Sequence, residues 1–459
     1  MDDFRLDFNE VNKSMGVNLE KKTYRNERRK TVHLLPFPTR NPERVLFDNG
    51  FMPIIAGALR KLNGFPIEST GGVKYAEDIM ARGKYKDNKA EAMFSHFLKN
   101  QLNQIEQGEI YDLSQITSIP MSERKPERVG EKELIHYVHD TFLVNHREEI
   151  LDGLNFKTSD NIILQLLIPE KETASKISMP IYRTHFKKLE QQFKADFLLL
   201  LKHPKFLLEN IDLFFAHYTF ISTSQLILQV SRYQQFDEDN WIKIYFLYHE
   251  EKAARWREAY KHGYQLLRTS MLNFYVHEHL INIVSQVPFI KKENVLYHEI
   301  YQTVKEYGSE AESAYLDSLH DWMETYFIEV NESNYTYIRH NNIPDTWKEM
   351  AKFIRPNIDK AMNSRFTLAF DSLFSKYYYK HGGSLGKLTG ISQRQILLLV
   401  ALSVGEERLE LNKLWDAFEK RGVYLDYQTR EIIVETLDRL NYIEKQSDSG
   451  DAQYVKPVL

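Results

Sequence analysis

The sequence of 459 residues contains no cysteine. This absence excludes disulfide bonds and cysteine-ligated zinc sites, and it favours a reducing compartment. An excess of positive charge is also missing, because 60 lysines and arginines stand against 64 aspartates and glutamates, a net charge of −4. The chain as a whole therefore has no positive field that would attract a phosphate backbone, and any contact with nucleic acid must be local.

Long uninterrupted apolar runs are missing as well. The most apolar window, Ile211–Val230, contains Asp212, His217 and Gln225, which favours a buried helix over a membrane span of about 20 predominantly apolar residues. The first ten residues, MDDFRLDFNE, are acidic, whereas a secretory signal begins with basic residues and continues with apolar ones. We expect a cytoplasmic protein that does not contact a membrane.

The sequence does contain enough apolar residues for more than one core. Hydrophobic residues make up 42% and charged residues 27% of the chain, and the length favours about two to four domains. Between residues 131 and 380, apolar residues recur three and four positions apart, which is typical of amphipathic helices. We predict a mainly α protein, an irregular multi-helix bundle with a C-terminal winged-helix (α+β) domain. The predicted regions are a polar arm with a basic segment (1–30), an N-terminal helical region (31–125), a central helical bundle (126–380), a Gly-rich linker (381–390) and the winged-helix domain (391–459).

The strongest local charge asymmetry lies in KKTYRNERRK, residues 21–30, where six basic residues accompany one acid, Glu27. Short basic runs are most often solvated, and a phosphate-contacting arm is the alternative. The residues that would contact DNA here are Lys21, Lys22, Arg25, Arg28, Arg29 and Lys30.

Residues 391–459 carry the signals of a winged-helix domain. The predicted elements, in chain order, are a helix capped by Ser392, the short strand RLEL, the helix LNKLWDAFEKRG, a helix capped by Asp426, and a hairpin around SDSG. This order is that of the helix-turn-helix variant in which the hairpin is the wing.

Winged helices usually read DNA through the exposed start of the third helix, where Gln428 and Arg430 are able to hydrogen-bond base edges in pairs. The charge argues against this use, because residues 391–459 contain nine lysines and arginines against twelve acids, a net charge of −3. A DNA duplex carries one negative charge per about 1.7 Å of axis and would repel such a surface. The sequence therefore favours a winged helix that docks a protein over one that reads DNA.

Signals for catalysis are weak. HGGSLGKLTG, residues 381–390, fails as a phosphate-binding loop because His381 stands where the loop needs glycine and Leu388 where it needs serine or threonine. We predict no nucleotide hydrolysis and no cofactor. A metal site is the chemical alternative, since His136, His139 and Asp140 lie on adjacent turns of a predicted helix, although no HExxH motif accompanies them.

Aromatic residues and cations alternate in YFLYHEEKAARWREAYKHGYQLL, residues 245–267. Stacking aromatics beside cations are able to bind single-stranded nucleic acid. The interpretation that we favour is one helix with an aromatic face in the core and a charged face in water.

The ending RGVYLDYQTREIIVETLDRLNYIEKQSDSGDAQYVKPVL, above all SDSGDAQYV, resembles the C-terminus of the DptG (DndG) family of bacterial DNA phosphorothioation-dependent restriction systems. No catalytic signature accompanies this resemblance. It implies participation, with partner proteins of the DptF and DptH types, in restricting invading DNA that lacks the host's sulfur-modified backbone. It also implies that nucleotide-driven motor work falls to those partners.

Three hypotheses follow, and the sequence favours the first. The chain is a non-catalytic scaffold or adaptor subunit of such a defence complex, with docked partner proteins and an optional contact with double-stranded DNA. The second hypothesis is a winged-helix DNA-binding regulator that uses Gln428 and Arg430. The third is a metal-dependent nuclease built on His136, His139 and Asp140.

Overall fold

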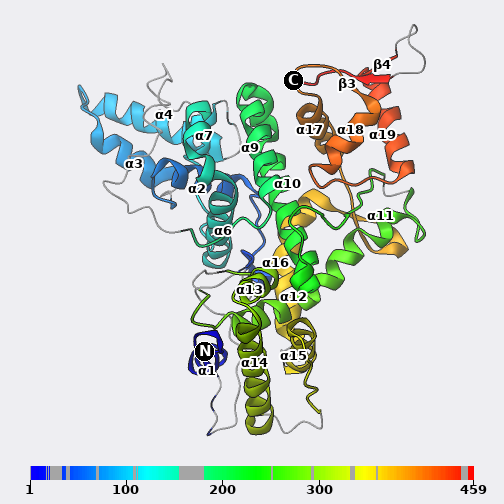
Figure 1. The fold of residues 1–459 in the computed structure, drawn as a ribbon. Coiled ribbons are helices and arrows are strands. Elements are labelled where there is room, and N and C mark those ends of the chain that lie inside the picture. Colours follow the sequence, from blue (N-terminus) through cyan, green and yellow to red (C-terminus); the bar gives the residue numbers. More distant parts are fainter. Residues whose placement is uncertain are drawn as a thin grey trace. The chain divides into compact units, whose positions relative to one another are not determined.

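The computed structural model describes most of the chain, and the predicted helical class is confirmed. The structure is mainly helical, with few short strands towards the C-terminus (Figure 1). The basic segment 21–30 and the predicted hairpin turn at 447–450 lie outside the described residues. The described residues are 2–16, 18, 20, 34–37, 42–68, 72–106, 110, 112–154, 180–249, 252–290, 294–330, 336–357, 360–445 and 453–459.

The chain divides into two compact units. Unit 1 comprises residues 1–35, 224–242 and 267–367, and unit 2 comprises residues 36–223, 243–266 and 368–459. Three helices contribute residues to both units, namely α10 (Pro204–Gln229), α12 (Tyr264–Val284) and α16 (Lys360–Tyr378). The units follow from spatial contacts, and the sequence-based division into five regions stays a prediction.

Unit 1 is helical and packs around two buried tryptophans. Trp322 stacks on Tyr326 with ring centroids 4.9 Å apart, and Trp347 lies 5.2 Å from Tyr297. The Trp322 indole N–H also donates to the Asn12 side-chain oxygen at 3.2 Å, which joins the N-terminal helix α1 (Phe8–Met15) to α14 (Ser309–Val330). Besides its parts of α10, α12 and α16, unit 1 contains η1 (Asp2–Phe4), α1 (Phe8–Met15), η5 (Val230–Gln235), α13 (Tyr297–Glu306), α14 (Ser309–Val330) and α15 (Ile343–Asn357).

The N-terminal half of unit 2 is built on the packing of α2 (Met52–Asn63) against α6 (Lys125–Val138). A Cβ atom on Gly57 would lie 2.3 Å from Cδ1 of Ile135, so any larger residue here would force the buried Ile135 side chain to move. Pro126 stands in the first turn of α6, where the missing N–H of proline costs no hydrogen bond. The remaining elements here are η2 (Pro42–Arg44), α3 (Gly72–Arg82), α4 (Asn88–Glu106), α5 (Leu113–Ile116), the π-helical turn η3 (His139–Leu143), η4 (Val144–His146) and α7 (Arg147–Leu154).

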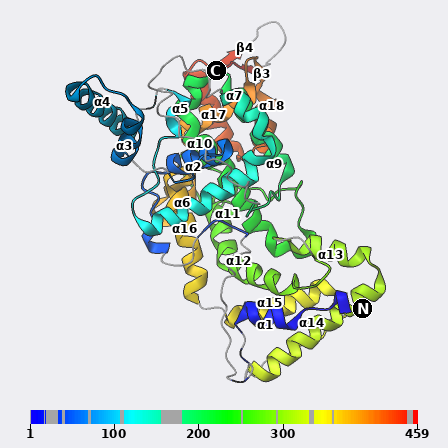
Figure 2. The ribbon, with the colours of Figure 1, turned by 90° about the vertical axis from the view of Figure 1, so that its left-hand side faces the viewer.

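Two features of unit 2 are plain in the ribbon. Figure 2 shows α3 and α4 side by side, projecting from the rest of the unit. Helix α10 lies in the core next to α9 (Lys187–Leu201), as the sequence predicted for residues 211–230: Phe214, Phe215 and Tyr218 are at most 1% exposed. A helix that is apolar on all sides is explained by such burial. Within the described residues, no helix combines the length and apolarity that crossing a membrane requires.

Residues 245–267 do not form the continuous helix that we expected. Tyr245 and Leu247 lie in extended backbone that bridges Tyr424 and Gly390, respectively. The Phe246 N–H donates to the carbonyl of Tyr424 at 3.0 Å, and regular helix resumes only with α11 (Glu258–Lys261) and α12. The local apolar period is helical, but backbone pairing with distant segments decides the conformation.

The Gly-rich stretch 381–390, predicted to be a linker, forms a β-hairpin. Strand β1 (Tyr379–His381) pairs antiparallel with β2 (Lys387–Thr389), and the short η7 (Gly383–Leu385) lies in the turn. Gly383 and Gly386 have φ angles of 58° and 75°, a left-handed conformation that glycine adopts without steric cost.

Residues 391–459, called the C-terminal module below, contain the predicted elements in the predicted order. The predicted helix caps are confirmed, because the Ser392 side chain accepts the Gln395 N–H and the Asp426 side chain accepts the Thr429 N–H. The three strands form an antiparallel sheet in the order β3 (Leu409–Glu410), β5 (Gln453–Val455) and β4 (Ile443–Lys445). The elements are α17 (Gln393–Val404), β3 (Leu409–Glu410), α18 (Leu411–Glu419), α19 (Tyr427–Arg439), β4 (Ile443–Lys445) and β5 (Gln453–Val455).

Candidate functional site

A buried ion pair fixes the C-terminal module to α9. Asp196 on α9 and Arg421, which follows α18, are only 3% and 5% exposed. The Arg421 guanidinium donates from Nε and Nη2 to the two carboxylate oxygens at 2.6 and 2.7 Å, a bidentate geometry. Its other donors reach the carbonyls of Leu402 and Ala417, both at 2.8 Å. Burial acts to lower the pKa of Arg421, but the Asp196 carboxylate raises it, so the guanidinium stays charged.

Helix α10 completes this attachment through two buried side chains. The Tyr218 hydroxyl donates to the Asp196 carboxylate. His217 lies 2.9 Å from the carbonyl of Arg421 through Nε2 and 3.1 Å from the Tyr378 hydroxyl through Nδ1. Burial lowers the pKa of His217 to about 4, so at neutral pH the imidazole is uncharged, Nε2 donates to the carbonyl and Nδ1 accepts from the hydroxyl. The polar groups of the attachment are thus satisfied within unit 2.

A second ion pair holds the start of α19. Arg257 donates through Nε to Asp426 at 2.9 Å and through Nη2 to the same carboxylate at 2.5 Å and to the Thr429 hydroxyl at 2.8 Å. Burial acts to raise the pKa of Asp426, but the hydrogen bonds from Arg257 and Thr429 lower it overall. The residue that caps α19 is therefore neutralised by an arginine from outside the module.

The two predicted base-reading residues differ in their surroundings. Gln428 is exposed at the start of α19. The Arg430 guanidinium donates to Glu419 at 2.8 Å and to the carbonyl of Leu425 at 3.0 Å, and it lies 5.5 Å from the ring centroid of Trp415. A guanidinium with these partners would have to give up an ion pair before it contacted a base.

The exposed positions of α19 after Gln428 carry three acids and one cation, Arg439. Glu431, Glu435 and Asp438 are exposed and follow one another at intervals of four and three residues, so they lie along one stripe. Arg421 and Asp426 are each neutralised from outside the module, so the net charge of −3 counted from the sequence is carried by its other side chains. We call Glu431, Glu435 and Asp438 the acidic stripe.

The predicted metal-ligand residues are brought together, but a lysine stands among them. Lys61 Nζ lies 2.8 Å from Oδ1 of Asp140 and 2.9 Å from Nδ1 of His136, and His139 Nδ1 donates to the same carboxylate oxygen at 2.6 Å. The second oxygen of Asp140 accepts the backbone N–H of Ile181 at 2.7 Å. Burial, with a contribution from Lys61, lowers the pKa of His136 to about 4.

This cluster acts as an internal ion pair. The Lys61 ammonium lies where a cation shared by His136 and Asp140 would lie, and Asp140 also accepts the backbone N–H of Ile181. Among the residues that the structure describes, no group of three histidines or carboxylates is arranged to hold a metal ion.

Replacement of Lys61 by methionine should destabilise the protein by about 2 kcal/mol, because the buried Asp140 carboxylate would keep only neutral hydrogen-bond donors. Urea unfolding followed by circular dichroism measures this. Lys132→Met is the matched control, since its pair with Glu68 is exposed and the expected change is below about 0.5 kcal/mol. Metal-dependent DNA cleavage that is lost in the variant with both His136→Ala and His139→Ala would instead support the nuclease hypothesis.

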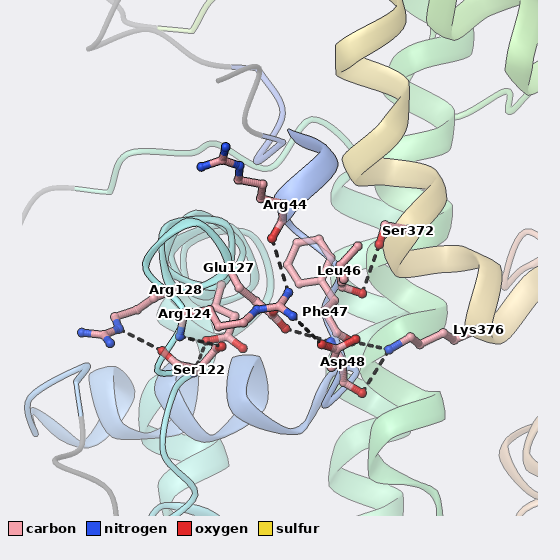
Figure 3. Close-up of polar contacts among 11 residues, drawn as sticks. Arg44, Leu46, Phe47, Asp48, Ser122, Arg124, Glu127, Arg128, Ser372 and Lys376 are labelled. Atoms are coloured by element: carbon pink, nitrogen blue, oxygen red, sulfur yellow. Dashed lines mark hydrogen bonds and ion pairs between the residues drawn. The ribbon is translucent and has the colours of Figure 1, made fainter. Parts of the chain in front are cut away.

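A third polar cluster ties residues 44–48 to α6 and α16 (Figure 3). Lys376 donates to the carbonyls of Phe47 and Asp48 at 2.5 and 3.0 Å, and buried Glu127 accepts the Asp48 N–H at 2.8 Å. Phe47 has a φ angle of 49°, rare for a residue other than glycine. The bonds on both sides of this residue hold it in place, which is a structural role.

The sequence analysis did not predict the residues that form the buried ion pairs described above. Lys61, Asp196 and Arg257 have partners that lie far away in the chain, and local periodicity carries no signal for such pairs. No protein-family model matches the chain, and no curated protein shows significant similarity to it.

Proposed function

We propose that this chain is a non-catalytic scaffold subunit of a bacterial phosphorothioation-dependent restriction complex, as the resemblance of its ending to the DptG family implies. In this proposal, residues 391–459 are a winged-helix module that docks partner proteins. The partners are of the DptF and DptH types, and the complex works in the cytoplasm.

The order of elements supports a winged helix. Helix α17, strand β3, helices α18 and α19, and the β4–β5 pair follow the order of that domain. Strand β3 pairs with β5, with Leu409 opposite Val455, so the short strand and the hairpin share one sheet. In a winged helix, α19 would be the recognition helix.

The observation that carries the docking role is the charge at this helix. Glu431, Glu435 and Asp438 line its exposed face, and Arg430 is paired with Glu419. A DNA-reading helix needs cations or uncharged polar groups beside the phosphates. An acidic helix face is suited to a basic surface of another protein, where charge complementarity gives specificity.

Reversal of the acidic stripe tests this role. A full-length variant with Glu431→Lys, Glu435→Lys and Asp438→Lys should recover at least about tenfold less of the partner subunits when purified from the native host, because like charges across an interface are costly. Its affinity for duplex DNA should rise, measured by fluorescence anisotropy over a range of salt concentrations.

The regulator hypothesis makes the opposite prediction. It requires wild-type protein to bind duplex DNA tightly, with a steep salt dependence, and to lose this binding in Gln428→Ala and Arg430→Ala. Unchanged recovery of partners by the charge-reversed variant, together with such DNA binding, would overturn the docking role.

A further inference from the structure

Two exposed aromatic residues are neighbours in sequence of the two members of the Arg257–Asp426 ion pair. Trp256 precedes Arg257 and is 64% exposed, and Tyr427 follows Asp426 and is 73% exposed. The other four tryptophans of the chain are buried or partly buried. Tryptophan and tyrosine are enriched among residues that dominate binding energy at interfaces. Folding of unit 2 gives no reason for this pair to remain in water.

We infer that Trp256, Tyr427, Lys252 and Arg255, called the aromatic patch below, bind an acidic segment of a partner protein. This inference rests on the proposed docking function and names the surface and the chemistry of its ligand. Its residues differ from those of the acidic stripe of α19, and the Tyr427 hydroxyl interacts with Glu431 of that stripe.

The backbone under the patch is held in place. Besides its bonds to Asp426 and Thr429, Arg257 donates through Nη1 to the carbonyl of Lys252 at 2.8 Å. The loop from 252 to 257 is thus closed on itself and fastened to the start of α19 by one buried side chain, 2% exposed. Aromatic anchors on a preorganised backbone lose little conformational entropy on binding.

The two cations of the aromatic patch indicate that its ligand is acidic. Lys252 and Arg255 are exposed, and within the described residues neither takes part in an ion pair with a side chain, whereas the nearby acid Glu258 is engaged by Lys261 and His262. Cations beside exposed aromatic rings favour a ligand that combines carboxylates with apolar side chains. Two further acids, Glu250 and Glu251, precede the loop in the sequence and lie outside the described residues, so the peptides tested must carry both signs of charge.

A nucleic acid fits this surface less well. Single-strand sites span about 4 to 16 nucleotides and need cations that follow the backbone. From Tyr427, α19 continues with Glu431 and Glu435, so a strand stacked on the patch would bring phosphates towards carboxylates. A protein segment is able to place its acids beside Lys252 and Arg255 alone.

The test uses the full-length protein and three labelled synthetic peptides of about 15 residues, with the same leucines and phenylalanines but an acidic, neutral or basic set of charged residues. We expect the acidic peptide to bind at least about tenfold more tightly than the neutral one in fluorescence anisotropy. Trp256→Ala should weaken this binding at least about tenfold, and Lys252→Glu with Arg255→Glu should transfer the preference to the basic peptide.

Tyr307→Ala is the matched control, because Tyr307 is 59% exposed in unit 1, and it should leave peptide binding unchanged. The inference is overturned if no peptide binds more tightly than the neutral one, if the basic peptide binds wild type best, or if Trp256→Ala has no effect. It is also overturned if oligothymidylate of about 20 nucleotides binds more tightly than the acidic peptide and loses affinity in Trp256→Ala.

Recovery of partner subunits separates this inference from the proposed function. If charge reversal of the acidic stripe lowers recovery and Trp256→Ala does not, the docking function stands and the aromatic patch is not its anchor. If neither variant lowers recovery, the docking function itself fails.

Discussion

Replacement of Arg421 by methionine is expected to destabilise unit 2 by about 3 to 5 kcal/mol, the largest effect among our predictions. The variant leaves the Asp196 carboxylate buried without its counter-ion, and it removes donors from the carbonyls of Leu402 and Ala417. Leaving one buried charge without its partner lowers the free energy of unfolding strongly. Replacing both partners of a buried ion pair by apolar residues changes it much less. Urea unfolding measured by circular dichroism gives the change in the free energy of unfolding.

Two further variants make this prediction specific. Arg394→Ala removes an exposed arginine that pairs with Asp212, and it should cost less than about 1 kcal/mol. Asp196→Leu combined with Arg421→Met removes both charges and should recover much of the loss. Equal stability of the Arg394 and Arg421 variants would show that Arg421 does not fasten the C-terminal module.

The second large effect is a dependence of stability on pH that comes from Glu131. Burial raises the pKa of this carboxyl from 4.5 to about 7, and the charge of nearby Glu127 acts in the same direction. The folded state therefore favours the protonated form. The stability that protonation contributes is complete below pH 4.5 and is lost as the pH rises through about 7. The shift corresponds to about 3 kcal/mol.

Glu131→Gln keeps an acceptor for the Ser122 N–H but carries no charge. We expect this variant to be more stable than wild type at pH 9, by up to about 3 kcal/mol, and similar to it at pH 5. Urea unfolding at both pH values measures the difference. Glu435→Gln, at an exposed position of α19, should follow wild type at each pH. A wild-type protein whose stability does not fall between pH 5 and pH 9 relative to Glu131→Gln would refute the assignment.

The helix caps and the buried helix were predicted correctly because they depend on residues that are close together in the sequence. Ser392 and Asp426 cap their helices as expected, because an N-cap needs only a side-chain oxygen and an N–H three residues later. The apolar window at residues 211–230 lies almost entirely in the buried helix α10, as its interrupting polar residues predicted. Such features depend on neighbours within a few residues.

Contacts between residues that are far apart in the sequence explain where the structure differs from the prediction. Residues 245–247 carry a helical apolar period, yet they are extended because they pair with Tyr424 and Gly390. His136 and Asp140 have the spacing of metal ligands, but Lys61 from another helix lies between them. Arg430 has the side chain of a base reader, and Glu419 engages it. In each case the deciding partner is far away in the chain or belongs to another element.

The sequence by itself determined the helical class, the positions of the caps in the C-terminal module and the net negative charge of that module, because composition and local hydrogen bonding suffice for these. Only the tertiary structure decided which charges and aromatic rings remain available: it buried Arg421 against Asp196, joined Arg257 to Asp426 and left Trp256 and Tyr427 exposed. The physical reason is that the strength of a charge or of an apolar side chain at a surface depends on burial and on partners, and folding brings these from distant parts of the chain.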